Sequence, residues 1–227
     1  MLGEKLELIQ TNSVIVSELH RAEKPLYLPA KRVFDIVLSF VGILIASPIV
    51  LIAAILIMID DWGSPFYLSR RVGKGGKDIG IIKLRTMKKH ADRLEDVLSP
   101  FEYKLYKKEF KLVHDPRITK LGHFLRKSSI DELPQLVNVF LGNMSLVGPR
   151  PILYEETLLY GERRAELLSM KPGLTGYWQA YKRNNATYET GERQRMELHY
   201  IEAASFAFDM KIFLKTFMAL AKKTGAL

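Results

Sequence analysis

An uninterrupted apolar run is the feature that most limits what this chain can fold into. From Ile36 to Ile59, 24 residues pass without a charge. As a helix at 1.5 Å per residue the run would be about 36 Å long, and the hydrocarbon core of a bilayer is about 30 Å thick. The run therefore predicts a membrane helix, and a buried core helix is the less favoured alternative at this length.

Two details favour a helix that re-enters one face of the membrane over one that spans it. Ser47-Pro48 lies near the centre of the run, where proline removes a backbone hydrogen bond and clashes with the preceding turn. Basic residues flank the run on both sides, so the positive-inside rule does not assign the flanks to opposite sides. We expect a re-entrant helix-hairpin broken at Ser47-Pro48, with a straight spanning helix as the alternative. The flanking residues are Arg21, Lys24, Lys31 and Arg32 before the run, and Arg70, Arg71, Lys74 and Lys77 after it.

The basic excess of the chain lies in one central segment. Residues 63 to 127 hold 17 lysines and arginines against 7 acidic residues, whereas the net charge of the whole chain is +9. Such a segment suits an anionic membrane, phosphorylated ligands or nucleic acid. No aromatic platform or nucleic-acid-binding motif accompanies it, so we expect no nucleic-acid partner. The absence of cysteine excludes a thiolate nucleophile and is typical of a cytoplasmic setting.

The remaining pattern predicts an α+β fold that is mostly helical. Two β-like pieces, 66–69 and 79–82, flank a glycine-rich turn and predict a small β-hairpin; the turn lacks the spacing of a phosphate-binding loop. Residues 88–113 read as two surface helices with a break at Ser99-Pro100, and 206–220 as a C-terminal helix. We divide the chain into an N-terminal lead-in (1–30), the membrane helix (31–61) and a catalytic domain (62–227) with amphipathic interfacial helices.

Asp131 and Glu132 are adjacent carboxylates that precede an amphipathic helix. The helix is predicted by apolar residues at helical spacing, Leu133, Leu136, Val137, Phe140 and Leu141, and ends at Gly142. The helix could begin at a capping box from Ser129 to Glu132. Pro134 would then lie inside the helix, where its missing N–H would leave one backbone hydrogen bond unmade. Asp131 as the N-cap is therefore favoured, which places both acids at the positive end of the helix dipole. A purely structural role, as a cap and a salt-bridge partner of Arg126, is the alternative.

Pro149-Arg150-Pro151 fixes an arginine in a rigid turn, which suits planar recognition of a base or phosphate. Carboxylates beside arginines also suit phosphate chemistry through a divalent cation, with one carboxylate oxygen attacking phosphorus. Together the two motifs suit phosphate chemistry, and the purely structural role of the two acids stays open beside it.

Seven ordered blocks over about residues 30 to 220 resemble the monotopic phosphoglycosyl transferases, the bacterial sugar transferase family. The blocks are 31–35 (KRVFD), Ser47-Pro48, 83–87 (KLRTM), 115–119 (DPRIT), 129–136 (SIDELPQL), 142–151 (GNMSLVGPRP) and 171–179 (KPGLTGYWQ).

The resemblance implies transfer of sugar-1-phosphate from a UDP-sugar to undecaprenyl phosphate, a polyprenol phosphate, giving polyprenyl diphosphate sugar and UMP. It assigns Asp131 as the nucleophile that carries a covalent phosphosugar, with Glu132 assisting and both holding Mg2+. It implies that Pro149, Arg150 and Pro151 contact the nucleotide and that Lys83, Arg85 and Arg126 are phosphate partners. Such a reaction would initiate exopolysaccharide, capsule or O-antigen synthesis.

The resemblance also implies a place at the bacterial cytoplasmic membrane, with the catalytic domain on the cytoplasmic face against the inner leaflet. Residues 180–185 depart from the family, which often has a small residue and Gly-Arg there, so the sequence does not identify the sugar. The rival hypotheses are an inactive membrane-anchored regulator of glycan assembly and a membrane-tethered basic nucleic-acid binder. A homodimer is compatible with the sequence.

Overall fold

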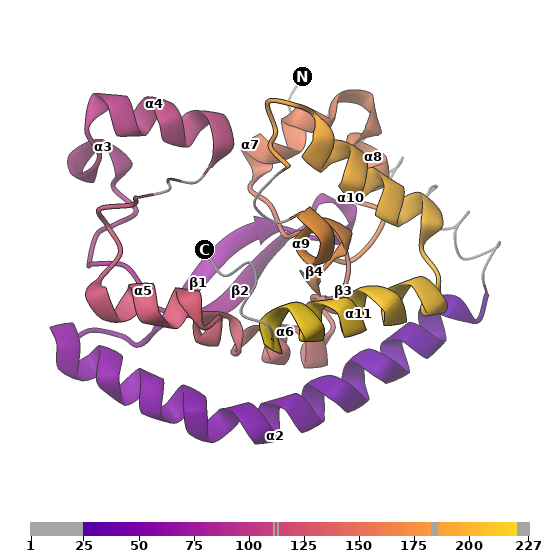
Figure 1. Ribbon diagram of the computed structural model, residues 1–227, viewed down its shortest axis with the longest axis horizontal. Coiled ribbons are helices and arrows are strands. Elements are labelled where there is room, and N and C mark those ends of the chain that lie inside the picture. Colours follow the sequence, from indigo (N-terminus) through magenta and orange to yellow (C-terminus); the bar gives the residue numbers. More distant parts are fainter. Residues whose placement is uncertain (1–24, 111, 113, 183–185, 222–227) are drawn as a thin grey trace.

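The long helix α2 (Tyr27–Asp61) carries the other elements of the fold. The computed structural model describes residues 25–110, 112, 114–182 and 186–221. Within them α2 is long and apolar enough to cross a membrane, and only 22% of its most apolar window is buried. Figure 1 shows α2 as a bow along the lower edge, with its concave side toward the other elements. The predicted apolar helix is confirmed. It begins at Tyr27, within the predicted lead-in (1–30). Residues 1–24 of that lead-in lie outside the described part of the chain.

The predicted break at Ser47-Pro48 is corrected by the structure. Pro48 lies inside one continuous helix, so the chain bends but does not reverse as a hairpin. Pro48 has no N–H to donate to the carbonyl of Leu44, four residues back. The Ser47 hydroxyl donates to that carbonyl instead, at 3.0 Å, so the helix continues without an unsatisfied acceptor.

The N-terminal end of α2 is attached to the rest of the fold by polar contacts, of which those of Lys31 are buried and those of Arg32 are partly exposed. The Lys31 ammonium donates to Asp209 at 2.6 Å and to the Val147 carbonyl at 2.7 Å. The Arg32 guanidinium donates to the carbonyls of Val139 and Phe140, at the C-terminal end of α6 (Gln135–Leu141). The two Arg32 bonds thus go to carbonyls in the last turn of α6, where a helix has no backbone donors four residues ahead.

The predicted β-hairpin is confirmed. β1 (Phe66–Val72) and β2 (Asp78–Leu84) pair antiparallel, with Phe66 opposite Leu84 and Val72 opposite Asp78. A short 3-10 turn, η1 (Lys74–Gly76), connects them; Gly75 adopts a φ of 70° that glycine permits without strain. The Asn138 side chain bonds both Ile82 N–H and the Gly80 carbonyl, which attaches α6 to this hairpin.

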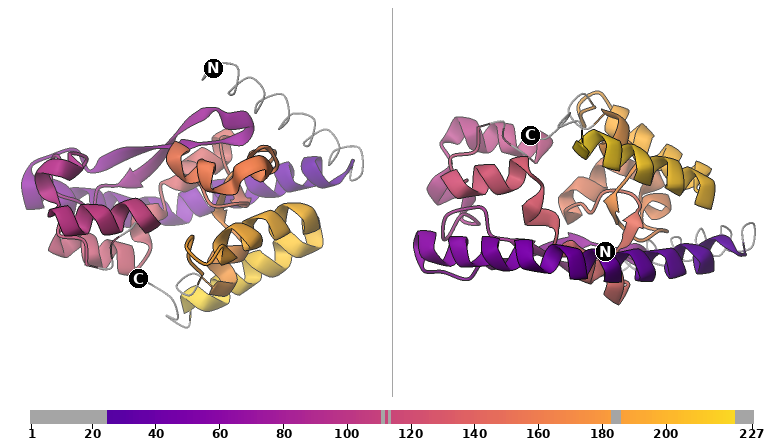
Figure 2. Two further views of the ribbon diagram at one scale, coloured as in Figure 1. Left: turned by 90° about the horizontal axis from the view of Figure 1, so that it is seen from above. Right: turned by 60° about the horizontal axis from the view of Figure 1, so that its bottom comes forward.

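The mostly helical α+β class is confirmed by the remaining elements. The break at Ser99-Pro100 separates two helices as predicted, because Ser99 caps the second in a capping box with Glu102. The core lies between α2, α6, β3 and the last two helices and includes Val139, Met144 and Tyr200. Figures 1 and 2 show α3 and α4 over the C-terminal half of α2, and α8, α10 and α11 over its N-terminal half. The bounds are α3 (Leu94–Val97), α4 (Pro100–Glu109), α5 (Lys120–Lys127), η2 (Ile130–Glu132), β3 (Ser145–Val147), α7 (Tyr154–Thr157), η3 (Leu158–Arg163), α8 (Arg164–Leu167), β4 (Gly173–Thr175, parallel to β3), α9 (Tyr177–Lys182), α10 (Glu192–Ala203) and α11 (Phe206–Ala221).

Candidate active site

Asp131 lies in the 3-10 turn η2, between α5 and α6. Ser129 starts the turn with a φ of 56° and its side chain caps nothing, and α6 begins only after Pro134. The predicted N-cap role of Asp131 is therefore wrong, and the alternative capping box is not formed. The reason is local: Leu133 N–H bonds back to Ile130 in a tight turn, and the fixed φ of Pro134 suits the residue at which the new helix begins. The predicted end of the helix at Gly142 is confirmed.

The Asp131 carboxyl is buried, with 7% of the residue exposed. Burial, and secondarily the charge of Glu132, raises its pKa to about 6, while Lys83 and Arg126 act in the opposite direction. The cations reduce the effect of burial but do not cancel it. At neutral pH the carboxylate is thus predominantly ionised and more basic than an exposed aspartate.

Lys83 comes to this carboxylate pair from β2. Its ammonium donates to Glu132 Oε1 at 3.0 Å, and both side chains are about one quarter exposed, at 25% and 27%. The structure therefore brings together four of the predicted site residues: Asp131, Glu132, Lys83 and Arg126.

Arg126 is oriented by residues to which the sequence assigned no role. Its Nε donates to the Thr86 hydroxyl at 2.8 Å. A Cβ at Gly122 would lie 2.0 Å from the Thr86 carbonyl, so only glycine lets α5 approach this closely. Behind Arg126, the buried pair of Asp115 and Arg117 joins at 2.6 Å. Thr86, Asp115 and Arg117 fall in two of the family-like blocks, 83–87 and 115–119, whereas Gly122 lies in none of them.

Arg85 lies beside the loop that follows α2. β2 ends at Leu84, so Arg85 lies just beyond the strand that carries Lys83. Both terminal nitrogens of Arg85 lie 2.7 Å from the place of a Cβ at Gly63, which puts the guanidinium beside the loop that follows α2.

Pro149, Arg150 and Pro151 form a second group at the other end of the hairpin. Arg150 N–H donates to Glu197 Oε2 at 3.2 Å, and its guanidinium lies 5.5 Å from the centre of the Trp178 ring. The next residue, Ile152, bridges to Val72, which pairs with Asp78 at the start of β2. Lys83 is five residues further along β2, a separation of roughly 16 Å.

The carboxylates suit a metal only together with a ligand. Among the described residues no three His, Cys, Asp or Glu side chains gather where they could hold a metal ion. Asp131 and Glu132 provide two carboxylates, and Mg2+ is commonly bound by one or two carboxylates together with substrate phosphates. The pair therefore fits Mg2+ bound with a diphosphate.

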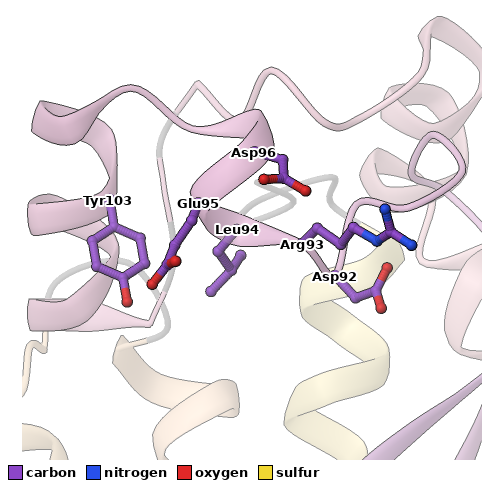
Figure 3. Close-up of a pocket in the computed structure, with 6 residues that line it drawn as sticks. All are labelled: Asp92, Arg93, Leu94, Glu95, Asp96 and Tyr103. Carbon is purple, nitrogen blue, oxygen red and sulfur yellow. The ribbon is translucent and has the colours of Figure 1, made fainter.

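A separate pocket between α3 and α4 does not have the charge of a donor site (Figure 3). Asp92, Arg93, Leu94, Glu95, Asp96 and Tyr103 line it. Three carboxylates against one guanidinium would repel a diphosphate. Figure 3 shows these carboxylates spread apart rather than converging on a point.

Comparison with known proteins shows the family to which this chain belongs. The family described as bacterial sugar transferase matches residues 26–223. The exopolysaccharide production protein ExoY of Sinorhizobium fredii is 36% identical over 219 residues, which cover 95% of this chain and 96% of that protein. The undecaprenyl-phosphate galactose phosphotransferase of Salmonella typhimurium is 40% identical over 199 residues, 86% of this chain and 41% of that protein. The galactosyl transferase CpsE of Streptococcus agalactiae is 38% identical over 226 residues, 99% of this chain and 49% of that protein. The resemblance found in the sequence is thus confirmed, and this chain belongs to the bacterial sugar transferase family.

Proposed function

We propose that this protein transfers sugar-1-phosphate from a UDP-sugar to undecaprenyl phosphate, the first step of building a surface polysaccharide. The observation that carries the proposal is Asp131, a buried carboxylate with a raised pKa set among Glu132, Lys83 and Arg126. The names of the relatives, among them a phosphotransferase that uses undecaprenyl phosphate, support the same acceptor.

The chemistry would proceed in two displacements at one phosphorus atom. A carboxylate oxygen of Asp131 attacks the β-phosphorus of the donor, the bond from that phosphorus to the bridging oxygen breaks, and UMP leaves with the electron pair. The sugar phosphate is then bonded to Asp131. An oxygen of undecaprenyl phosphate attacks the same phosphorus, the bond to Asp131 breaks, and the carboxylate is restored.

The surrounding charges would stabilise these steps. Phosphoryl transfer needs positioning and positive charge near the phosphoryl oxygens. Lys83 is held by Glu132 and Arg126 by Thr86, so both cations are oriented before the donor arrives. Bound by Asp131 and Glu132, Mg2+ would supply further positive charge to the diphosphate.

The second group would bind the nucleotide. Ile152, two residues after Arg150, bridges to the strand pair at the start of β2, and Lys83 lies roughly 16 Å further along that strand. An extended nucleoside diphosphate sugar has comparable length. We place the uridine at Pro149-Arg150-Pro151 and the β-phosphate at Asp131. Arg85, whose guanidinium lies beside Gly63, stays a predicted phosphate partner.

The bow of α2 supports a monotopic placement in one leaflet. Both of its ends rise toward the catalytic elements in Figure 1, and α2 exposes large apolar side chains along its length, including Val33, Ile45 and Ile59. Exposed Phe124 of α5 and Phe217 of α11 would extend this apolar surface. We place the catalytic elements at the cytoplasmic face, where UDP-sugars are made.

Turnover by the purified full chain tests the proposal. UDP-sugars would be supplied singly with Mg2+ and undecaprenyl phosphate, and release of UMP and of lipid-linked sugar would be measured. We expect turnover with at least one donor, its loss in Asp131→Asn, and its retention in Asp92→Asn, an exposed carboxylate. Failure of every common UDP-sugar, or full activity of Asp131→Asn, would contradict the proposal.

A further inference from the structure

A buried stack of guanidinium groups and aromatic rings lies behind the loop that carries Arg150. Trp178 of α9, which is 4% exposed, lies close to two arginines: Arg150 at 5.5 Å and Arg193 at 4.4 Å from its ring. Arg193 in turn lies 4.0 Å from the ring centre of Tyr188. The quadrupole of an aromatic ring attracts a guanidinium, and more strongly when water is excluded. The stack therefore restricts where the Arg150 guanidinium can lie.

Two buried carboxylates hold the backbone of the same loop. Glu197 Oε2 accepts from Arg150 N–H at 3.2 Å, and Glu156 Oε1 accepts from Leu153 N–H at 2.9 Å. Glu197 is 1% exposed, and burial raises its pKa to about 7, against the opposing charge of Arg193. Burying a carboxylate is costly. Glu197 is nevertheless buried where its carboxylate accepts the hydrogen bond of the Arg150 N–H, which indicates that holding this amide is its role.

We propose that Trp178 and Glu197 are positioning residues for nucleotide binding, Trp178 through the Arg150 guanidinium and Glu197 through the Arg150 amide. The inference rests on the proposed contact between Arg150 and the nucleotide. A preorganised arginine binds better because less side-chain and loop entropy is lost on binding. Neither residue needs to touch the donor.

The affinity for UDP, measured by calorimetry on the full chain with Mg2+, tests the proposal without requiring turnover. We expect Trp178→Leu, which removes the ring, to weaken UDP binding by about three- to tenfold. Because Trp178 acts through Arg150, the double variant Arg150→Ala/Trp178→Leu should bind UDP no more weakly than Arg150→Ala alone. Glu197→Ala should weaken binding, and Glu197→Gln, which keeps a carbonyl acceptor for the Arg150 amide, should restore most of it.

A matched control is available in the neighbouring helix α7. Tyr154 has the guanidinium of Arg164 4.5 Å from its ring centre, a pair of the same type that does not include Arg150. We expect Tyr154→Leu to leave the UDP affinity unchanged. Thermal unfolding would establish that each variant is folded. If Trp178→Leu does not fold, Trp178→Phe keeps a smaller ring and can replace it in the same double-variant comparison.

Two results would overturn the positioning role. One is an unchanged UDP affinity in Trp178→Leu, and the other is a double variant in which the two losses multiply, since independent effects would then act. If Arg150→Ala itself leaves UDP binding unchanged, the nucleotide contact fails, and the positioning role fails with it. The chemistry at Asp131 is tested separately by the loss of turnover in Asp131→Asn.

Discussion

Replacing Asp131 with asparagine should stabilise the fold while removing activity. The folded protein raises the pKa of this carboxyl from 3.8 to about 6, so its ionised form is held at a cost. A shift of one unit is worth about 1.4 kcal/mol, so the shift corresponds to about 3 kcal/mol at pH 7.5. For a chain of this size that is a rise in Tm of roughly 6 to 12 °C.

The sign of the pH dependence makes this prediction specific. Between the unfolded and folded pKa values the folded state binds more protons, so wild-type stability falls as pH rises from about 4 to 6 and then levels off. About 2 kcal/mol of the advantage of Asp131→Asn should therefore appear between pH 4.5 and 7.5.

Unfolding would be followed in detergent, without divalent cations or nucleotide, for wild type, Asp131→Asn and the exposed control Asp92→Asn. If Asp131→Asn is no more stable than wild type at pH 7.5, burial does not raise the pKa of Asp131 as described. The same holds if the difference in stability between the two proteins does not grow with pH. Asp92→Asn should show neither effect.

Three further substitutions test the electrostatics of the site, the packing of α5 and the bend of α2. Lys83→Met removes a cation that lowers the pKa of Asp131, so the acid limb of the kcat/KM profile should move to higher pH; an unmoved limb would speak against the coupling. Gly122→Ala places a Cβ 2.0 Å from the Thr86 carbonyl and should lower the free energy of unfolding by about 1–3 kcal/mol in denaturant titrations, and no loss would mean that α5 can shift. Pro48→Ala restores a backbone donor in α2, so the helix should straighten; cysteine labelling of its flanks from outside intact cells should then reach one flank, whereas neither is reached in wild type.

Local patterns predicted several elements, among them the two longest helices, α2 and α11. Alternating residues around a glycine-rich turn indicated β1 and β2, and Ser99-Pro100 marked a helix start because a capping residue and a proline at the first turn both favour it. The continuity of α2 was missed because proline alone favours a break. The Ser47 hydroxyl, bonded to the carbonyl that Pro48 leaves free, makes the difference.

The site was predicted in composition but not in geometry. The pairing of Lys83 with Glu132, and of Arg126 with Thr86, joins residues 49 and 40 positions apart, and no local pattern encodes such distances. The raised pKa of Asp131 depends on burial by the assembled fold, whereas the sequence emphasised its nearby cations.

Intact-mass measurement can detect the proposed covalent phosphosugar on Asp131. Full-length protein incubated with its UDP-sugar and Mg2+, but without undecaprenyl phosphate, should gain the mass of one sugar phosphate. Peptide mapping should place that mass on Asp131, and addition of undecaprenyl phosphate should remove it. No added mass in an enzyme that turns over, or added mass that persists in Asp131→Asn, would contradict this account.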